Sequence, residues 1–341
     1  MVIIRSMKKV TIKDIAREAG VSVGLASMVF NGKPGVSQKS KEKVMAVMKK
    51  MNYTPNKAAT VLRSGVKKTI GVITPDLANH YFSDISRHIE NIAYENGYTV
   101  LFGSSDERKD KIASLIDTFN ADGIKGILIT PCEDCEEDIR RALRYGMKVV
   151  LMNRSLHMDE ENVGTVMLDN EKAIRIAIEH LIANGYSRIE MITNNEKLST
   201  LNSRMEFYKQ IMAEMGLGKY TRINLLKDVE KEEEVDEIVR LAYKRGTEAI
   251  LIPRGYLALY VCRSIKKLGL RIPEDIAIIG CDGGLSYRIM TPTVSEIKQS
   301  PRETAEESFT MLMNMMKGDA PGKRLLLEPS LVLGDSTKRT I

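Results

Sequence analysis

A regular alternation of short apolar runs and amphipathic stretches begins at Thr69, and it restricts the fold more than any other feature of the sequence. The apolar runs predict buried strands over 69–74, 98–103, 124–130, 147–152, 163–168, 188–193, 248–253 and 275–280. The stretches between them predict helices over 81–96, 106–120, 136–145, 171–184, 203–215, 231–245 and 256–268. A helix over 302–317 and a strand-like run over 325–333 close the chain.

This alternation is typical of an α/β fold in which helices cover both faces of parallel sheets. It extends over about 230 residues, which is more than one typical sheet accommodates. We therefore expect two doubly wound parallel-sheet subdomains.

Ligands of open parallel sheets bind beyond the carboxyl ends of the strands, so the residues that follow each strand are candidates for a binding site. These residues are polar and of mixed charge, which suits a small polar molecule. Glycine-rich loops of the dinucleotide-binding and Walker types, which hold nucleotide phosphates, are missing. The candidates are Asp76, Ser104 to Asp106, Cys132, Asn153, Arg154, Asn194, Asn195, Arg254 and Asp282.

Two short helices are predicted ahead of the alternation, within residues 11–32. Thr11 and Asp14 have the spacing of a capping box, and Gly20 is a natural helix stop. Ser22 is a suitable cap for the second helix. The expected inner faces are Ile12, Ile15, Ala16 and Ala19 in the first helix, and Leu25, Ala26, Val29 and Phe30 in the second. The layout is that of a helix-turn-helix, although an ordinary pair of packed helices has the same pattern.

The charge of the chain is distributed unevenly. Residues 1–68 carry fifteen Lys and Arg against three Asp and Glu, whereas the remainder is mildly acidic. A strongly basic head on an acidic body indicates contact with a polyanion, and a solvated basic face is the alternative.

A third helix is predicted from Ser37, with Val44, Val47, Met48 and Met51 on its inner face. Pro55 ends the helical region, and residues 57–64 have the composition of a further short helix. A helix of this length is marginal in water unless something holds it.

The four cysteines include one C-x-x-C pair, Cys132 and Cys135. A structural zinc site requires a second pair, and Cys262 and Cys281 are far from it in sequence. A pair of free thiols is the expected state, with metal or redox chemistry as the alternatives. The spacing of the four histidines and the lack of a nucleophile elbow argue against an enzyme, and we expect no cofactor.

No apolar run approaches the length of a membrane span, and the segment before Met7 is shorter than a signal peptide. Met7 is an alternative start. A cytoplasmic protein that does not contact membranes is therefore expected.

Several segments together resemble the lactose/galactose repressor (LacI/GalR) family of bacterial transcription regulators. They are TIKDIAREAGVS, FNGKPGVS, YTPNKAATVLRSG followed by KTIGVITPD, LDNEKAIRIAIEHLIANGYSRI, RMEFY, LGLRIPEDIAIIGCD and TPTVSEIKQ. The resemblance implies a helix-turn-helix headpiece, a hinge helix and a core like that of periplasmic sugar-binding proteins. It also implies a homodimer that binds a pseudo-palindromic operator under the control of a small effector.

The resemblance further implies the DNA-contacting residues. The second helix would present Val23, Gly24, Ser27 and Met28 to the major groove, and Leu62 and Arg63 of the hinge would enter the minor groove. The supporting contacts would come from Thr11, Ser22, Asn31, Ser37, Ser40, Tyr53 and Asn56. The family commonly has Thr at Leu25, Arg or His at Met28, and polar groups at Val23 and Gly24. Apolar side chains favour thymine methyls over bidentate contacts with bases, so specificity depends on the hinge and on DNA deformation or the operator is unusual.

In the core, the resemblance implies effector contacts by Arg204 and Asp282, with Asn153 and Tyr81 lining the same cleft. A guanidinium and a carboxylate that face each other can hold vicinal hydroxyls. Arg254-Gly255 replaces a family Asn-Asp pair, and Gly283 replaces an Asn or Asp. Two interpretations follow. Either the effector is anionic, such as a sugar acid or a sugar phosphate, or Arg254 neutralises the charge of Asp282 in the empty cleft.

The expected organisation is a headpiece over 1–55, a hinge helix and linker over 56–68, and an effector-binding core over 69–341. Within the core, an N-subdomain of about 69–168 and 300–328 and a C-subdomain of about 169–299 and 329–341 are expected. The predicted function is that of a sequence-specific transcriptional repressor controlled by a small polar effector. A periplasmic-type sugar-binding protein without a DNA-binding role is the alternative.

Overall fold

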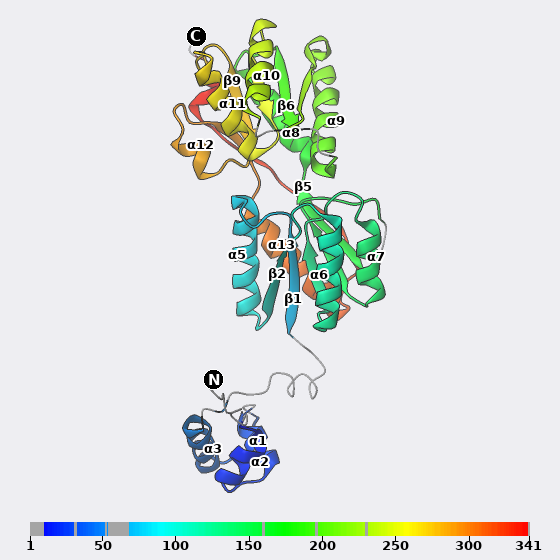
Figure 1. The fold of residues 1–341 in the computed structure, drawn as a ribbon, viewed down its shortest axis with the longest axis vertical. Helices are drawn as coiled ribbons and strands as arrows, with labels where there is room; N and C mark the ends of the chain where they lie inside the picture. The colour runs from blue at the N-terminus through cyan, green and yellow to red at the C-terminus, as the bar shows by residue number, and fades with distance from the viewer. Residues whose placement is uncertain are drawn as a thin grey trace, which may run out of the picture. The chain divides into compact units, whose positions relative to one another are not determined.

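The computed structural model describes residues 10–30, 33–51, 53, 68–158, 161–194, 197–228 and 231–339. The chain divides into two compact units, Met1–Lys67 and Lys68–Ile341 (Figure 1). Each unit is described by itself below.

The first unit contains three helices, α1 (Ile12–Glu18), α2 (Val23–Phe30) and α3 (Gln38–Lys50). The predicted capping box is present at α1, where the Thr11 hydroxyl accepts from Asp14 N and the Asp14 carboxylate accepts from Thr11 N. Gly20 adopts a positive φ of 59° in the turn to α2, a conformation that favours glycine. Ser37 caps α3 by accepting from Ser40 N.

The predicted inner faces of these helices form a small shared core. Its buried members are Ile15, Ala16, Ala19, Ala26, Val29, Val44 and Met48. The prediction for Phe30 was wrong, because its side chain at the end of α2 is 37% exposed. Its ring instead meets the ring of Tyr53 edge-on, with 6.2 Å between centroids.

The second unit contains two six-stranded sheets, each the centre of one subdomain. The sheet of the N-subdomain has the order β11-β5-β4-β3-β1-β2, and all its pairs are parallel. Its strands are β1 (Thr69–Thr74), β2 (Thr99–Ser104), β3 (Gly126–Ile129), β4 (Lys148–Met152), β5 (Val163–Leu168) and β11 (Arg324–Leu327).

The sheet of the C-subdomain has the order β12-β10-β9-β8-β6-β7. It is parallel except at one edge, where β12 runs antiparallel to β10. Its strands are β6 (Ile189–Asn194), β7 (Ile223–Leu226), β8 (Ala249–Ile252), β9 (Ala277–Cys281), β10 (Ser295–Lys298) and β12 (Ser330–Val332). The predicted fold class, a helical headpiece followed in sequence by two doubly wound parallel-sheet subdomains, is confirmed, and the antiparallel edge strand β12 is the one departure from parallel pairing among the described strands.

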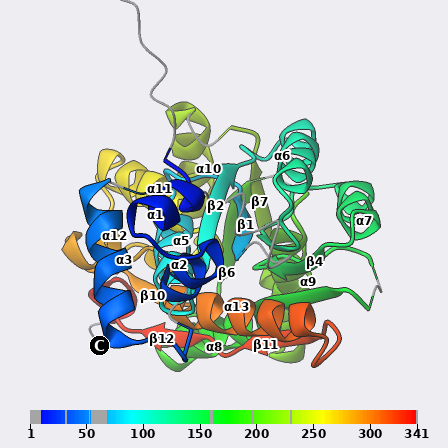
Figure 2. The same ribbon diagram turned by 90° about the horizontal axis from the view of Figure 1, so that it is seen from below.

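Helices cover both faces of each sheet, as the buried strands require. In the N-subdomain, α13 (Pro301–Lys317) packs on β3, β4 and β5 beside α5 (His80–Glu95). The opposite face is covered by α6 (Lys109–Ala121) and α7 (Glu136–Arg144), an arrangement visible in Figure 2. In the C-subdomain, α8 (Asn170–Ala183) and α9 (Ser199–Glu214) cover one face, and α10 (Glu232–Lys244) and α11 (Gly255–Lys267) cover the other. The short helices are η1 (Gly218–Tyr220), α12 (Leu285–Ile289) and η2 (Asp335–Thr337).

The chain crosses between the subdomains after β5, after β10 and after β11. The run over 325–333, predicted as one strand-like segment, is two strands in two different sheets. The break falls at Glu328 and Pro329, where proline has no N–H for a continuous ladder. Strands β7 and β10 were missed in the sequence, because Asn224 interrupts one apolar run and Glu296 the other.

Candidate functional site

The start of α2 is an exposed surface of the headpiece. Ser22, Val23 and Gly24 are exposed, and Ser27 and Met28, one turn further on, are half-buried. The Ser22 hydroxyl accepts from Leu25 N at 3.2 Å, so it caps the helix that carries this face. The residues predicted to read bases thus lie along the first two turns of one helix.

The other predicted DNA contacts are distributed around the headpiece. Thr11 and Ser37 are helix caps, and the Ser37 hydroxyl donates to the Ser40 hydroxyl at 2.9 Å. Tyr53 packs against Phe30. Asn31, Asn56, Leu62 and Arg63 lie outside the described residues.

In the core, a chain of side-chain hydrogen bonds joins the two subdomains. Asn153, directly after β4, donates from Nδ2 to the Tyr81 hydroxyl on α5 and to Gln299 Oε1 at 3.3 Å. Gln299 in turn donates from Nε2 to Asp282 Oδ2 at 2.9 Å, and its backbone N donates to Asp282 Oδ1 at 3.0 Å. Gln299 lies in the crossing between β10 and α13, and it was not among the predicted site residues.

Asn153 and Asp282 share an unusual backbone conformation. Their φ angles are 64° and 52°, and each residue directly follows the carboxyl end of a strand, β4 or β9. Left-handed non-glycine residues cost free energy and often occur at functional sites. Here each of the two residues belongs to the hydrogen-bonded series that joins the subdomains.

Arg204, on α9, is almost completely buried, with 4% of the residue exposed. Its Nε donates to Asn170 Oδ1 at 2.8 Å and its Nη1 to the Pro253 carbonyl at 2.6 Å. These two bonds fix the plane of the guanidinium. Within the described part of the chain, Nη2 has no hydrogen-bond partner, so it is available to a ligand.

The surroundings of Asp282 perturb its titration. Burial raises the pKa of Asp282 from 3.8 to about 6, although the positive charge of Arg204 and the bonds from Gln299 act in the opposite direction. Burial and the nearby Asp282 carboxylate also raise the pKa of Tyr81, so its hydroxyl remains protonated and can donate.

Three predicted residues have other partners or lie elsewhere. Asp76 is exposed after β1 and accepts from Ala78 N at 2.7 Å. Arg154 is buried and makes a bidentate pair with Glu107, at 2.8 and 2.7 Å, so its guanidinium supports the N-subdomain loops. Arg254 precedes α11, and its guanidinium lies 4.6 Å from the centre of the Tyr256 ring.

Gly255 and Gly283, the two glycines at which the sequence departs from the family pattern, both lie close to Tyr287. A Cβ at Gly283 would lie 2.0 Å from the Tyr287 ring. The Tyr287 hydroxyl donates to the Gly255 carbonyl at 2.8 Å, and a Cβ at Gly255 would lie 2.6 Å from the Asp282 carbonyl. Glycine at these two positions therefore allows Tyr287 and the two loops to pack closely.

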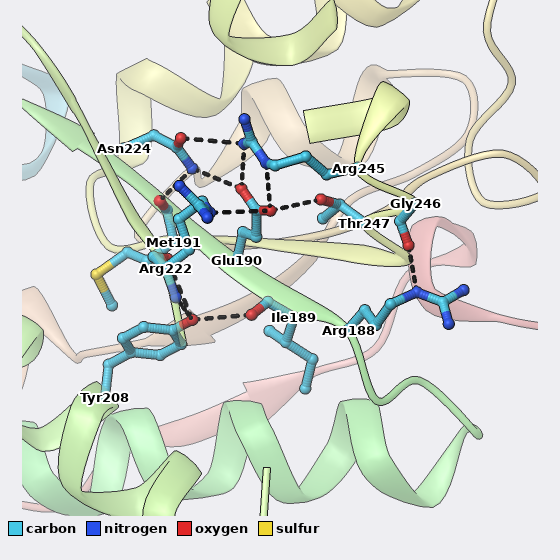
Figure 3. A network of polar contacts seen from close by, with 10 residues as sticks. All are labelled: Arg188, Ile189, Glu190, Met191, Tyr208, Arg222, Asn224, Arg245, Gly246 and Thr247. Carbon is cyan, nitrogen blue, oxygen red and sulfur yellow. Dashed lines mark hydrogen bonds and ion pairs between the residues drawn. The ribbon is translucent and has the colours of Figure 1, made fainter. Parts of the chain in front are cut away.

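A separate polar network stabilises the C-subdomain near the amino end of β6 (Figure 3). The buried Glu190 carboxylate accepts from Arg245 at 3.0 and 2.6 Å, from Thr247 at 2.8 Å and from Asn224 at 2.8 Å. Burial opposes ionisation, but these bonds and the Arg245 charge hold the pKa of Glu190 below its usual value. Arg188, at the lower right of Figure 3, bonds the Gly246 carbonyl. The network lies at the opposite ends of the strands from Asp282, so its role is structural.

All four cysteines are buried and unbridged. Among the described residues, no three His, Cys, Asp or Glu side chains are grouped as metal ligands. The described helices also include none that is long and apolar enough to cross a membrane.

Comparison with known proteins identifies both units. The family described as "Bacterial regulatory proteins, lacI family" matches residues 11–56, and "Periplasmic binding protein-like domain" matches residues 178–337. Catabolite control protein A of Priestia megaterium is 28% identical over 331 residues, which are 94% of this chain and 96% of the relative. HTH-type transcriptional repressor PurR of Vibrio vulnificus (strain CMCP6) is 27% identical over 331 residues, 96% of this chain and 99% of the relative.

Among solved structures, the Lac repressor bound to ONPG in the repressed state superposes with a TM-score of 0.84. It is 26% identical, and the match covers 96% of this chain and 100% of that one. The two units thus define a class of protein in which a helix-turn-helix headpiece precedes a periplasmic-binding-protein-like core. The chain belongs to the lacI family of bacterial regulatory proteins. It is a DNA-binding transcriptional regulator, and the alternative of a sugar-binding protein without a DNA-binding role is excluded by the headpiece.

Proposed function

We propose that this regulator is a repressor that binds a pseudo-palindromic operator as a homodimer and responds to a sugar or sugar derivative bound between its two subdomains. The observation that carries the effector site is the bonded series Tyr81–Asn153–Gln299–Asp282, which spans both subdomains. A ligand that replaces any of these bonds changes how the subdomains are held together. Such a ligand couples its own binding to a change in the core.

The chemistry of this region supports a polyhydroxylated effector. Asp282 accepts hydrogen bonds, and Arg204 Nη2 donates them from a guanidinium whose plane is fixed by Asn170 and Pro253. A donor fork and a carboxylate can hold adjacent hydroxyls from two sides. The Tyr81 ring supplies a face against which a sugar ring can stack.

Arg254 supports an anionic effector, such as a uronate or a sugar phosphate. It follows β8, between the strands that precede Asn194 and Asp282, and the neighbouring glycines leave few carboxylates to repel an anion. The remaining members of the proposed effector set, Asp76 and Arg154, shape the loops of the N-subdomain.

The headpiece supports DNA recognition by α2. Ser22, Val23, Gly24, Ser27 and Met28 form the proposed major-groove face. The proposed contacts with the DNA backbone come from Thr11, Ser37, Ser40 and Tyr53, and from Asn31 and Asn56, which lie outside the described residues. Leu62 and Arg63, also outside the described residues, are proposed to enter the minor groove. Because the reading face is largely apolar, thymine methyls and DNA deformation would carry much of the specificity.

The wider organisation is part of the same proposal. The proposed domain boundaries are the ones predicted from the sequence, a headpiece to residue 55 and a hinge helix and linker over 56–68, of which 56–67 lie outside the described residues. The relatives are transcriptional regulators, which supports a cytoplasmic protein without enzymatic activity.

Two measurements test the proposal. Selection of bound duplexes from a random library, followed by retardation assays at several salt concentrations, is expected to yield a pseudo-palindrome and a salt-dependent affinity. Melting of the full chain with neutral sugars, uronates and sugar phosphates is expected to show stabilisation by one class. Stabilisation by neutral sugars alone would contradict the anionic effector, and stabilisation by none of them would contradict the sugar class.

A further inference from the structure

The Cys132–Cys135 segment forms a tight turn between β3 and α7. Glu133 and Asp134 are its central, exposed residues, and Asp134 has a positive φ of 55°. The ends of such a four-residue turn lie within about 7 Å of each other, which is compatible with the Cα separation of a disulfide. The Cys135 Sγ donates to the Cys132 carbonyl at 3.2 Å, so the second sulfur is folded back over the first cysteine.

The two thiols differ in character. Cys132 is 5% exposed, whereas Cys135 is fully enclosed and occupies the N-cap position of α7. The hydrogen bond with the Cys135 thiol lowers the pKa of Cys132, and the same bond together with burial raises the pKa of Cys135. Among the charged neighbours, the Glu107 carboxylate raises the pKa of Cys132 and its partner Arg154, bonded to the adjacent Pro131 carbonyl, lowers it by less, so the bond from the Cys135 thiol is the main cause of the decrease. A more acidic, more accessible thiol next to a protonated one is the arrangement of an attacking and a resolving cysteine.

The turn is also in contact with the other subdomain. Glu133, between the two cysteines, forms an ion pair of 3.3 Å with Lys197, which lies just before α9. Close by, Thr200 on α9 donates to the Asn153 carbonyl at 2.9 Å. The turn and Asn153 thus contact the same segment of the C-subdomain, residues 197–200.

We propose that Cys132 and Cys135 are a peroxide-reactive dithiol that closes reversibly to a disulfide and restrains the contact between Glu133 and Lys197. The Cys132 thiolate attacks hydrogen peroxide and forms a sulfenic acid with release of hydroxide, which takes up the proton lost by the thiol. The Cys135 sulfur then attacks the Cys132 sulfur, its proton leaves with the hydroxyl as water, and the S–S bond forms. Two thiols are oxidised by two electrons, and one peroxide is reduced to two waters.

The test is thiol counting on the folded full-length chain before and after treatment with hydrogen peroxide. We expect four free thiols to fall to two, a disulfide between Cys132 and Cys135 in the peptide map, and full recovery with dithiothreitol. In Cys135→Ala the reaction should stop at a sulfenic acid that dimedone traps on Cys132. Cys132→Ala should lose the response, and Cys262→Ala, a buried thiol of the C-subdomain, should retain it.

The coupling to the other subdomain has its own readout. Oxidation should slow amide hydrogen exchange at the start of α9 in the wild type and leave it unchanged in Lys197→Ala, because that variant lacks the partner of Glu133. Retention of all four thiols in the folded protein, or loss of thiols in Cys132→Ala equal to that of the wild type, would overturn the dithiol. Exchange at α9 that is indifferent to oxidation would overturn its effect on the subdomain contact.

Discussion

The pH dependence of stability should reveal the raised pKa of the Asp282 carboxylate at the subdomain junction. Asp282 has a pKa of about 6 in the folded chain, against 3.8 as its ordinary value. Between these two values the folded state holds a proton that the unfolded state has released. Stability from this group is therefore present at low pH and is lost as the pH rises from about 4 to about 6. The difference between 3.8 and about 6 corresponds to about 3 kcal/mol at most.

Asp282→Asn isolates this contribution, because the amide cannot ionise and retains an oxygen that accepts from Gln299. We expect the free energy of unfolding of the wild type to fall relative to that of Asp282→Asn by about 2–3 kcal/mol between pH 4 and pH 7. Urea unfolding of both proteins at closely spaced pH values measures the difference, and the titration of every shared group cancels in it.

Asp76→Asn is the matched control, because Asp76 is an exposed carboxylate that also follows a strand and interacts locally with Ala78 N. If the difference in free energy of unfolding between the wild type and Asp282→Asn stays constant from pH 4 to pH 7, the pKa of Asp282 is not raised in the folded chain. A difference that changes in the opposite direction would also contradict the raised pKa. It would mean that the positive charge of Arg204 lowers the pKa of Asp282 by more than burial raises it.

Three further predictions concern single side chains. Arg204→Lys should weaken effector binding about tenfold or more by calorimetry, because an ammonium cannot bond Asn170, the Pro253 carbonyl and a ligand in one plane; unchanged affinity would remove Arg204 from the site. Gly283→Ala should lower the free energy of unfolding by about 1–3 kcal/mol in urea, because the new methyl overlaps the Tyr287 ring; an equally stable variant would show that the loop repacks freely. Glu190→Gln should destabilise the chain by up to about 3 kcal/mol at pH 7, because Arg245 loses its charged partner. The difference from the wild type should shrink as the pH falls below about 4.5, since the lowered pKa of Glu190 stabilises the fold only while the carboxylate is ionised; a loss that does not change with pH would exclude the ionic contribution.

The sequence predicted the long, uniformly apolar strands because burial on both faces of a parallel sheet leaves a continuous signal. All five residues of β9, for example, are apolar or glycine and buried. It failed at β10, where Ser295 and Glu296 interrupt the apolar pattern although both are buried. Glu296 is accommodated there because its carboxylate accepts from the backbone of Gly283 and Gly284, a contact between distant segments that periodicity does not contain.

The missed strand also concealed a site residue. Gln299 directly follows β10, and the rule that ligands bind after strand ends would have selected it once β10 had been predicted. Arg154 illustrates the opposite limit. Its position after β4 made it a candidate, but its direction is set by Glu107, which adopts a positive φ of 56° in a different loop. Position along the chain predicts which edge of a sheet a residue occupies, whereas the partner of its side chain depends on tertiary packing.

In the proposed function, a ligand bound at Arg204 and Asp282 controls the affinity of the headpiece for DNA. The most direct measurement is the dissociation constant of the protein for the selected operator, in the wild type and in Arg204→Ala. It is measured with and without the compound, among the neutral sugars, uronates and sugar phosphates, that raises the melting temperature of the chain most. We expect the ligand to change the wild-type dissociation constant about tenfold or more, and Arg204→Ala to bind the same operator without responding to the ligand. An operator affinity that the ligand leaves unchanged in the wild type, or changes equally in both proteins, would contradict it.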